Sequence, residues 1–249
     1  MGKKIGKYIF LALEMALMIT IIVFQTLTIT VNDDLVKNTP NIYPIVKWLY
    51  IISTLLAFIF SLICGIYSIK KTHIPAKERT HVLVIYLFVN LIADIFFNTL
   101  GTLAGFIVFI FSYLLIGIMI FRKKYELIIR GVAYVILVAL ALIIPKARNS
   151  LGIIGSIILA TLLSNIVILL VQYAKTKDKS ILILLISQFL ALLSDLSMVG
   201  RSQLSNEIAS NVFGYIVWIT YILANSLIAL AYVNKLNILR GKIHEQNQD

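Results

Sequence analysis

Eight long apolar segments constrain this 249-residue chain more than any other feature of its sequence. A membrane-spanning helix needs about 20 mostly apolar residues, so eight such segments with short connections use nearly the whole chain and leave no sizeable soluble domain. The segments lie near residues 8–31, 47–69, 81–100, 102–121, 127–144, 151–172, 180–199 and 212–233.

The composition excludes the other broad classes. Hydrophobic residues make up 60% of the chain and charged residues 13%, whereas soluble domains average about 45–50% and about 25%. A β-barrel would show short alternating segments, but the run 51–63 is apolar without alternation. Helices also satisfy their own backbone hydrogen bonds in lipid. We therefore predict an all-α polytopic membrane protein, with a single eight-helix domain over residues 1–233 and a tail over 234–249.

The net charge of +11 predicts orientation. The N-terminal segment, the second, fourth and sixth connections and the tail together hold 17 of the 22 Lys and Arg residues, and the other connections hold five. This bias predicts that both termini lie in the cytoplasm. The membrane is the cell membrane if the source is prokaryotic. The basic clusters then contact anionic lipid headgroups at the cytoplasmic face, and a nucleic-acid partner is not expected.

Motifs for cofactor chemistry do not appear in the sequence. We find no Gly-rich phosphate loop, nucleophile elbow or dinucleotide fingerprint. The three His residues and the single Cys do not cluster with carboxylates inside a segment, so no metal site is expected. No cofactor is predicted.

Three of the eleven carboxylates, Glu14, Asp94 and Asp195, fall inside apolar segments. An ionisable group at membrane depth is costly and therefore indicates function. Residues 88–95 resemble residues 189–196, and in the segment after each, Ser112-Tyr113 resembles Thr220-Tyr221. The matches suggest two four-helix halves in the same orientation, a 4+4 parallel repeat whose interface would bind ligands. Chance similarity between short apolar segments is the alternative.

Polar residues accompany both aspartates. Asn90 and Asn98 lie four residues on either side of Asp94, and Gln188 lies two helical turns before Asp195. We expect these groups to line one polar cavity, open toward the outer leaflet, with Asp94 and Asp195 as catalytic residues. The predicted substrate-binding residues are Asn90, Asn98, Tyr113, Gln188, Trp218, Tyr221 and Asn225.

Two carboxyl groups in such a cavity have a chemical use. One stays protonated as a general acid, while the other stays ionised as a base or electrostatic stabiliser. Reactions through an oxocarbenium ion suit such a pair. The same residues would also serve as interhelical hydrogen-bonding groups, or as coupling sites in a small-solute or ion transporter, and the residues alone leave these alternatives open.

Two stretches around the aspartates resemble the YhhN, or lysoplasmalogenase, family of eight-span membrane proteins. They comprise residues 90–97 with 105–121, and residues 192–196 with 220–228. The resemblance implies hydrolysis of the vinyl-ether bond of a membrane lysolipid, without a cofactor, by aspartates that correspond to Asp94 and Asp195. Ala93, Ser112 or Tyr113, and Ile222 with Asn225 differ from the usual family residues, which implies a divergent member.

Three further features each have a structural interpretation as well as a functional one. Glu14 favours a structural or interfacial role, on a stripe with Gln25 and Thr28. Thr161, Asn165 and Gln172 form a stripe in the sixth segment and indicate cavity lining or interhelical bonding. The tail is either a solvated helix end or an extension of the last helix that contacts a partner, as in a non-enzymatic sensor.

Overall fold

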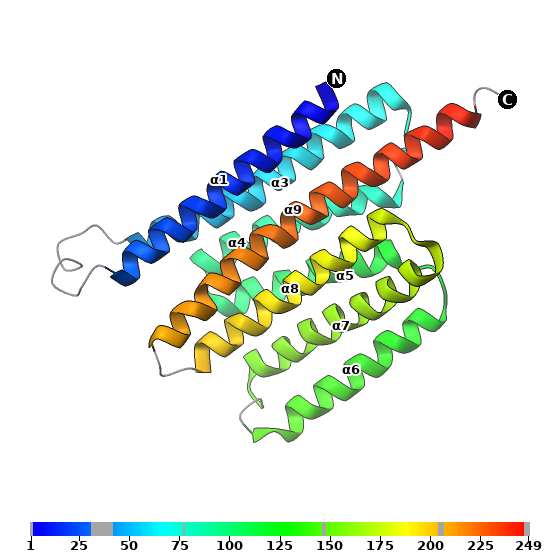
Figure 1. The fold of residues 1–249 in the computed structure, drawn as a ribbon. Coiled ribbons are helices and arrows are strands. Elements are labelled where there is room, and N and C mark those ends of the chain that lie inside the picture. Colours follow the sequence, from blue (N-terminus) through cyan, green and yellow to red (C-terminus); the bar gives the residue numbers. More distant parts are fainter. Residues whose placement is uncertain (1, 31–41, 77, 146–147, 204–206, 247–249) are drawn as a thin grey trace.

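The structure, a computed structural model, describes residues 2–30, 42–76, 78–145, 148–203 and 207–246. Within these residues the chain forms eight α-helices and one short 3-10 helix, η1 (Arg79–His81), and no strand (Figure 1). The α-helices are α1 (Gly2–Thr30), α3 (Ile42–Thr72), α4 (Val82–Thr99), α5 (Thr102–Ile120), α6 (Tyr125–Ile143), α7 (Ser150–Thr176), α8 (Lys179–Gln203) and α9 (Glu207–Gln246).

All eight helices are long and apolar enough to cross a membrane. Large apolar side chains stay exposed along their outer faces, for example Ile63 on α3, Phe111 on α5 and Val135 on α6, as expected where lipid replaces water. The prediction of an all-α, multi-pass membrane protein with eight helices is confirmed. Val31 of the predicted first segment and residues 247–249 of the tail lie outside the described residues.

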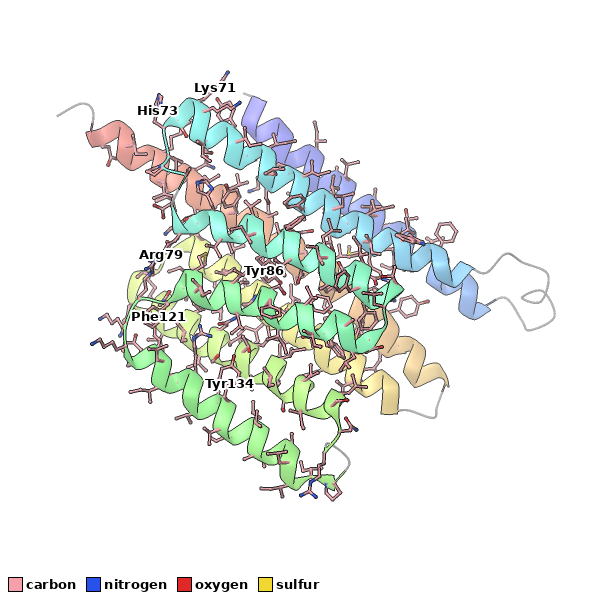
Figure 2. The ribbon with its side chains drawn as sticks, turned by 180° about the vertical axis from the view of Figure 1, so that it is seen from behind. Lys71, His73, Arg79, Tyr86, Phe121 and Tyr134 are labelled. Atoms are coloured by element: carbon pink, nitrogen blue, oxygen red, sulfur yellow. The ribbon has the colours of Figure 1, made fainter. Side chains whose placement is uncertain are left out.

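Most of the described basic residues lie at one end of the bundle, although Arg148 lies at the other. The start of α1 and the end of α9 lie at this end (Figure 1), as do Lys71, Arg79 and Phe121 when the bundle is seen from behind (Figure 2). We call it the basic end. Because successive helices run in opposite directions, eight of them return the chain to the side on which it starts.

A tight turn joins α4 to α5. Leu100 and Gly101 separate the two helices, and the N–H groups of both donate to the Phe96 carbonyl, over 2.8 and 3.0 Å. Gly101 has φ +99°, a conformation that favours glycine because it has no Cβ. The turn holds α4 and α5 side by side, which brings Asn90 on α4 against Ser112 on α5.

The order of helix contacts agrees with the predicted repeat. In the first half α1 packs on α3, α3 on α4 and α4 on α5; in the second α6 packs on α7, α7 on α8 and α8 on α9. Between the halves, α5 packs on α7 and α9 packs on α3, which are equivalent pairs under a two-fold relation. Accordingly, α1 and α6 lie at opposite edges of the bundle (Figure 1). The added contacts of α9 with α1 and α4 depart from this symmetry.

We predict that Gly105→Ala destabilises the bundle. An added Cβ would lie 2.7 Å from Phe97 Cβ and 2.9 Å from its Cα, so α4 and α5 would have to separate. Overpacking of this kind costs about 1–3 kcal/mol, so thermal unfolding in detergent should show a lower Tm. Gly155→Ala is the matched control, since no atom lies within 4 Å of its added Cβ. An equal loss in both variants would contradict the packing argument.

Candidate functional site in the bundle core

Asp94 is almost completely buried on α4, with 2% of its surface exposed. The Tyr221 hydroxyl on α9 donates to its Oδ1 over 2.7 Å. Its Oδ2 is buried and has no hydrogen bond of good geometry among the described residues, although the Thr54 hydroxyl on α3 lies near the carboxyl group. One oxygen is therefore fixed by a phenol from the second half of the chain, while the other is held less firmly.

Asp195 on α8 is held in the same way by the other half. The Tyr113 hydroxyl on α5 donates to Asp195 Oδ2 over 3.1 Å. Each half therefore supplies one aspartate, and each aspartate is bound by the tyrosine of the opposite half. Asp195 is half-buried, so it is the more accessible of the two carboxyl groups.

Asn90 lies at the centre of a hydrogen-bond network that connects α4, α5 and α9. Its Nδ2 donates to Asn225 Oδ1 over 2.9 Å and to the Tyr221 hydroxyl over 3.3 Å. Its Oδ1 accepts from the Ser112 hydroxyl over 2.8 Å. Asn225 in turn donates to Thr54 Oγ1 on α3 over 3.3 Å. The network fixes the Tyr221 phenol that binds Asp94.

The remaining predicted residues adjoin these two pairs. Asn98 donates to the Tyr50 hydroxyl and, over 2.8 Å, to the Asp94 carbonyl. Trp218 stacks on Tyr50 with ring centroids 4.6 Å apart. Asn98 and Trp218 therefore connect to the hydrogen-bond network through their contacts with Tyr50, on the side of Asp94.

Gln188 belongs to the side of Asp195. Asn165 on α7 donates from its Nδ2 to Gln188 Oε1 and to the Tyr113 carbonyl, over 3.2 Å in each case. The expected role of Asn165 in interhelical bonding thus matches its contacts, and Gln188 connects to Asp195 through Asn165 and Tyr113.

Aromatic rings join the two sides. Phe109 contacts both Tyr221 and Tyr113, with ring centroids 6.3 Å apart in each pair. Tyr86 contacts Tyr113 at 6.4 Å and accepts from Asn90 over 3.5 Å, and it lies well inside the bundle (Figure 2). All nine residues singled out from the sequence therefore belong to one continuous cluster of hydrogen bonds and ring contacts, which we call the aspartate network.

Four buried polar atoms of the aspartate network have no hydrogen-bond partner among the described residues. They are Asp94 Oδ2, Asn98 Oδ1, Asn165 Oδ1 and Gln188 Nε2. A buried polar group without a partner costs about 1–3 kcal/mol, so such groups normally bind water or ligand. Their concentration here distinguishes the network from ordinary helix contacts.

The two aspartates lie at similar depth. Asp94 and Asp195 each precede the last residue of their span, Thr99 and Gly200, by five positions. At 1.5 Å per residue both lie about 7.5 Å inside the end opposite the basic end. The expected cavity beside the two aspartates stays a prediction. The pocket that the described part of the chain forms lies at the basic end, and none of the nine residues lines it.

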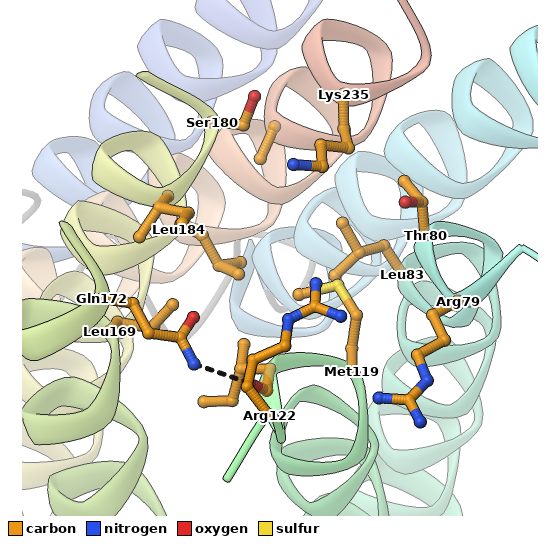
Figure 3. A pocket seen from close by; sticks show the side chains of 13 residues that line it. Arg79, Thr80, Leu83, Met119, Arg122, Leu169, Gln172, Ser180, Leu184 and Lys235 are labelled. Atoms are coloured by element: carbon orange, nitrogen blue, oxygen red, sulfur yellow. Dashed lines mark hydrogen bonds between the residues drawn. The ribbon is translucent and has the colours of Figure 1, made fainter. Parts of the chain in front are cut away.

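That pocket, of about 50 Å³, lies between η1 and helices α4, α5, α7, α8 and α9 (Figure 3). Polar residues of its lining include Arg79, Arg122, Gln172, Ser180 and Lys235. Leu83 on α4 lines it eleven residues before Asp94, a separation of about 16 Å along the helix. The pocket and the aspartate network are therefore distinct.

Sequence reasoning missed several participants. Tyr50, Thr54 and Tyr86 look like ordinary helix residues in the sequence, since hydroxyl groups recur in every segment. The sequence singles out Ser112 for its match to Thr220, but does not predict its bond to Asn90. Glu126, in the first turn of α6, was placed outside the apolar segments but is 1% exposed. Its carboxylate accepts from the Arg122 N–H over 2.7 Å and from the Gln172 amide over 3.1 Å. The sequence signal for its burial is its position one residue before the apolar segment 127–144.

Glu14 is also buried, and Ser53 on α3 donates to its Oε2 over 2.5 Å. Its Oε1 has no hydrogen bond of good geometry among the described residues, although the Ser226 hydroxyl on α9 lies near the carboxyl group. Ser53 precedes Thr54, so Glu14 lies one helix away from the network. The side chains of Gln25 and Thr28, expected on the same stripe, lie outside the described side chains.

Within the described residues, no group of three or more His, Cys, Asp or Glu side chains is placed to hold a metal ion. Comparison with protein-family models, with curated proteins and with solved structures finds no match to this chain. The resemblance to the lysoplasmalogenase family therefore remains a prediction from the motifs around the two aspartates.

We predict that Asn90→Ala lowers the Tm, because Asn225 Oδ1 and the Tyr221 phenol both lose their donor inside the bundle. The expected cost is about 1–3 kcal/mol. Asn237→Ala, at an exposed position of α9, is the control and should leave the Tm unchanged. The double variant Asn90→Ala/Asn225→Ala should lose less than the sum of the single losses; strict additivity would argue against the network.

Asp178, between α7 and α8, contributes to the free energy of unfolding in a pH-dependent way. Partial burial raises the pKa of Asp178, but hydrogen bonds from Lys235 over 3.0 Å and from the Ser180 N–H over 2.8 Å outweigh burial and lower the pKa. Because the pKa is lower in the folded state, the ionised carboxylate stabilises the fold at pH values above the unfolded-state pKa of about 3.9. This stabilisation is lost as the pH falls through the folded-state pKa.

Asp178→Asn should therefore lower the Tm at neutral pH and leave it unchanged in strong acid, where the wild-type carboxyl group is protonated as well. Thermal unfolding across pH measures the two curves. A constant offset between them, persisting into acid, would contradict a role for the charge.

Proposed function

We propose that the chain is a membrane-embedded lipid hydrolase, similar to lysoplasmalogenase, that cleaves the vinyl-ether bond of a lysophospholipid with Asp94 and Asp195. The observation that carries the proposal is the reciprocal pair of aspartates, each bound by the tyrosine of the other half. An acid and a base in one network is what vinyl-ether hydrolysis requires.

The chemistry assigns the aspartates different tasks. Protonated Asp94 gives its proton to the vinyl carbon that is not bonded to oxygen, and an oxocarbenium ion forms at the carbon bonded to oxygen. Ionised Asp195 stabilises this cation and then takes a proton from the attacking water. The resulting hemiacetal passes its hydroxyl proton to the glycerol oxygen as the carbon–oxygen bond breaks, releasing an aldehyde and the glycerophospho-base, and the proton on Asp195 returns to Asp94. One water is consumed, and no cofactor is needed.

The surroundings of Asp195 favour a lipid substrate. Asp195 is half-buried, and Leu193 and Leu196 beside it on α8 are 47% and 49% exposed on the outer apolar surface. A lysolipid that contacts this outer surface would pass between the helices to reach the Asp195 carboxyl group, which faces Tyr113 and not the lipid. Asn98, Trp218 and Tyr50 provide donors and an aromatic surface for the polar part of the substrate on the side of Asp94.

The second candidate is a small-solute or ion transporter that uses the same network. The reciprocal pairs favour it, since both aspartate–tyrosine bonds join the two halves, and relative movement of halves is how parallel-repeat transporters work. A transporter would carry protons or solute across vesicles without releasing aldehyde. A non-enzymatic sensor, favoured by the continuation of α9 to Gln246, would do neither.

The test measures aldehyde release from an alkenyl lysophospholipid by the purified protein in detergent or vesicles. Asp94→Asn and Asp195→Asn should each reduce the rate by at least roughly 100-fold, the usual contribution of a general acid or base. Tyr221→Phe and Tyr113→Phe should reduce it less, because the carboxyl groups remain. Glu245→Gln, at an exposed position of α9, is the control.

Each variant is first checked for folding by its Tm. Full activity in either Asn variant rejects the acid–base scheme, and no aldehyde release by wild-type protein together with aspartate-dependent proton flux favours the transporter.

A further inference from the structure

The pocket at the basic end gathers positive charge. Its lining contains Arg79, Arg122 and Lys235 and no carboxylate. Three cations around one small pocket repel one another, and because Arg79 and Arg122 are exposed, water screens part of this repulsion. Such an arrangement is relieved when an anion binds between the cations.

The existing contacts neutralise the three cations incompletely. Lys235 forms an ion pair with Asp178 at 3.0 Å. The Nη1 of Arg79 donates to the Phe121 carbonyl over 2.9 Å, which uses one of the five N–H donors of the guanidinium. The charges of both arginines remain without a carboxylate partner among the described residues.

Arg122 is the most available of the three. Its backbone N–H binds Glu126, whose other oxygen binds Gln172, so the nearby carboxylate is already occupied by neutral donors. The Gln172 amide also donates to the Ile120 carbonyl over 2.7 Å, which fixes the wall beside Arg122 (Figure 3). The guanidinium of Arg122 and the ammonium of Lys235 both point into the space between the helices (Figure 3).

The inner wall of the pocket is apolar. Leu83, Ile120, Leu169 and Leu184 line it, and each is at most 3% exposed. A pocket with cations at its polar side and core leucines behind them suits an anion attached to an apolar group better than a bare inorganic ion. At about 50 Å³ it exceeds the space of roughly 10–15 Å³ that one water needs.

We propose that this pocket binds a phosphate-bearing anion, in the form of an anionic phospholipid headgroup from the leaflet at the basic end. Arg122 and Arg79 bind the phosphate oxygens, since guanidinium groups match them in geometry. Lys235 adds charge, and the apolar wall contacts the glycerol and the start of the acyl chain. This site is separate from the aspartate network and does not depend on the proposed hydrolase activity.

The experiment titrates the full-length protein, purified in an uncharged detergent, with short-chain phosphatidylglycerol, short-chain phosphatidylcholine or inorganic phosphate, and follows Tm. A ligand that binds only the folded state raises the Tm in a concentration-dependent way. Phosphatidylglycerol should stabilise the wild type, and phosphatidylcholine, which has no net charge, should do so less. Arg122→Gln should weaken the apparent affinity for phosphatidylglycerol by about tenfold or more.

Lys123→Gln is the matched control. Lys123 is adjacent and exposed, carries the same charge and does not line the pocket, so its variant should bind like the wild type. Arg79→Gln should show the same loss as Arg122→Gln. Stabilisation by inorganic phosphate alone, abolished in both arginine variants, supports the phosphate site with a soluble ligand as its source.

Two results would overturn the proposal. The first is that neither phosphatidylglycerol nor inorganic phosphate raises the Tm of the wild type. The second is that Lys123→Gln loses as much affinity as Arg122→Gln, which would show that diffuse surface charge attracts the lipid without a defined pocket.

Discussion

The side-chain hydrogen bonds between the two halves determine how this bundle is arranged inside lipid. Among apolar helices in an apolar solvent, burial of hydrocarbon gives little preference for one packing over another. Polar side chains do, because a buried group without a partner is costly. Asn90, with partners on α5 and α9, and the two aspartate–tyrosine pairs can all be satisfied only when the four central helices meet in one register.

The crossed pairing has a further meaning for the fold. If each aspartate were bound by the tyrosine of its own half, each half could satisfy its polar groups alone. Here α4 needs α9, and α8 needs α5. The halves are thus interdependent, and the outer helices α1 and α6 are the elements that such a network leaves least constrained, although Glu14 ties α1 to α3 through Ser53.

The helices and the site residues differ in how far sequence could predict them. Apolar runs of about 20 residues identify the spans because lipid permits few other structures, and a carboxylate within such a run is conspicuous, which is why Asp94 and Asp195 were found. Thr54 and Tyr86 could not be distinguished from other polar helix residues, since their role depends on which helix faces them. Glu126 was missed because burial next to a span boundary depends on the neighbouring Gln172, and the crossed pairing depends on tertiary contacts that no local pattern encodes.

The continuous course of α9 has a consequence for the two polar regions of the molecule. The helix spans 40 residues, about 60 Å at 1.5 Å per residue, so it is longer than the roughly 30 Å hydrocarbon core. Tyr221 and Lys235 lie fourteen residues apart, close to four full turns, and so project from nearly the same side of this one helix. A sliding or rotation of α9 displaces both together, and by thermodynamic linkage occupancy at either end that favours one position of the helix alters the free energy of binding at the other.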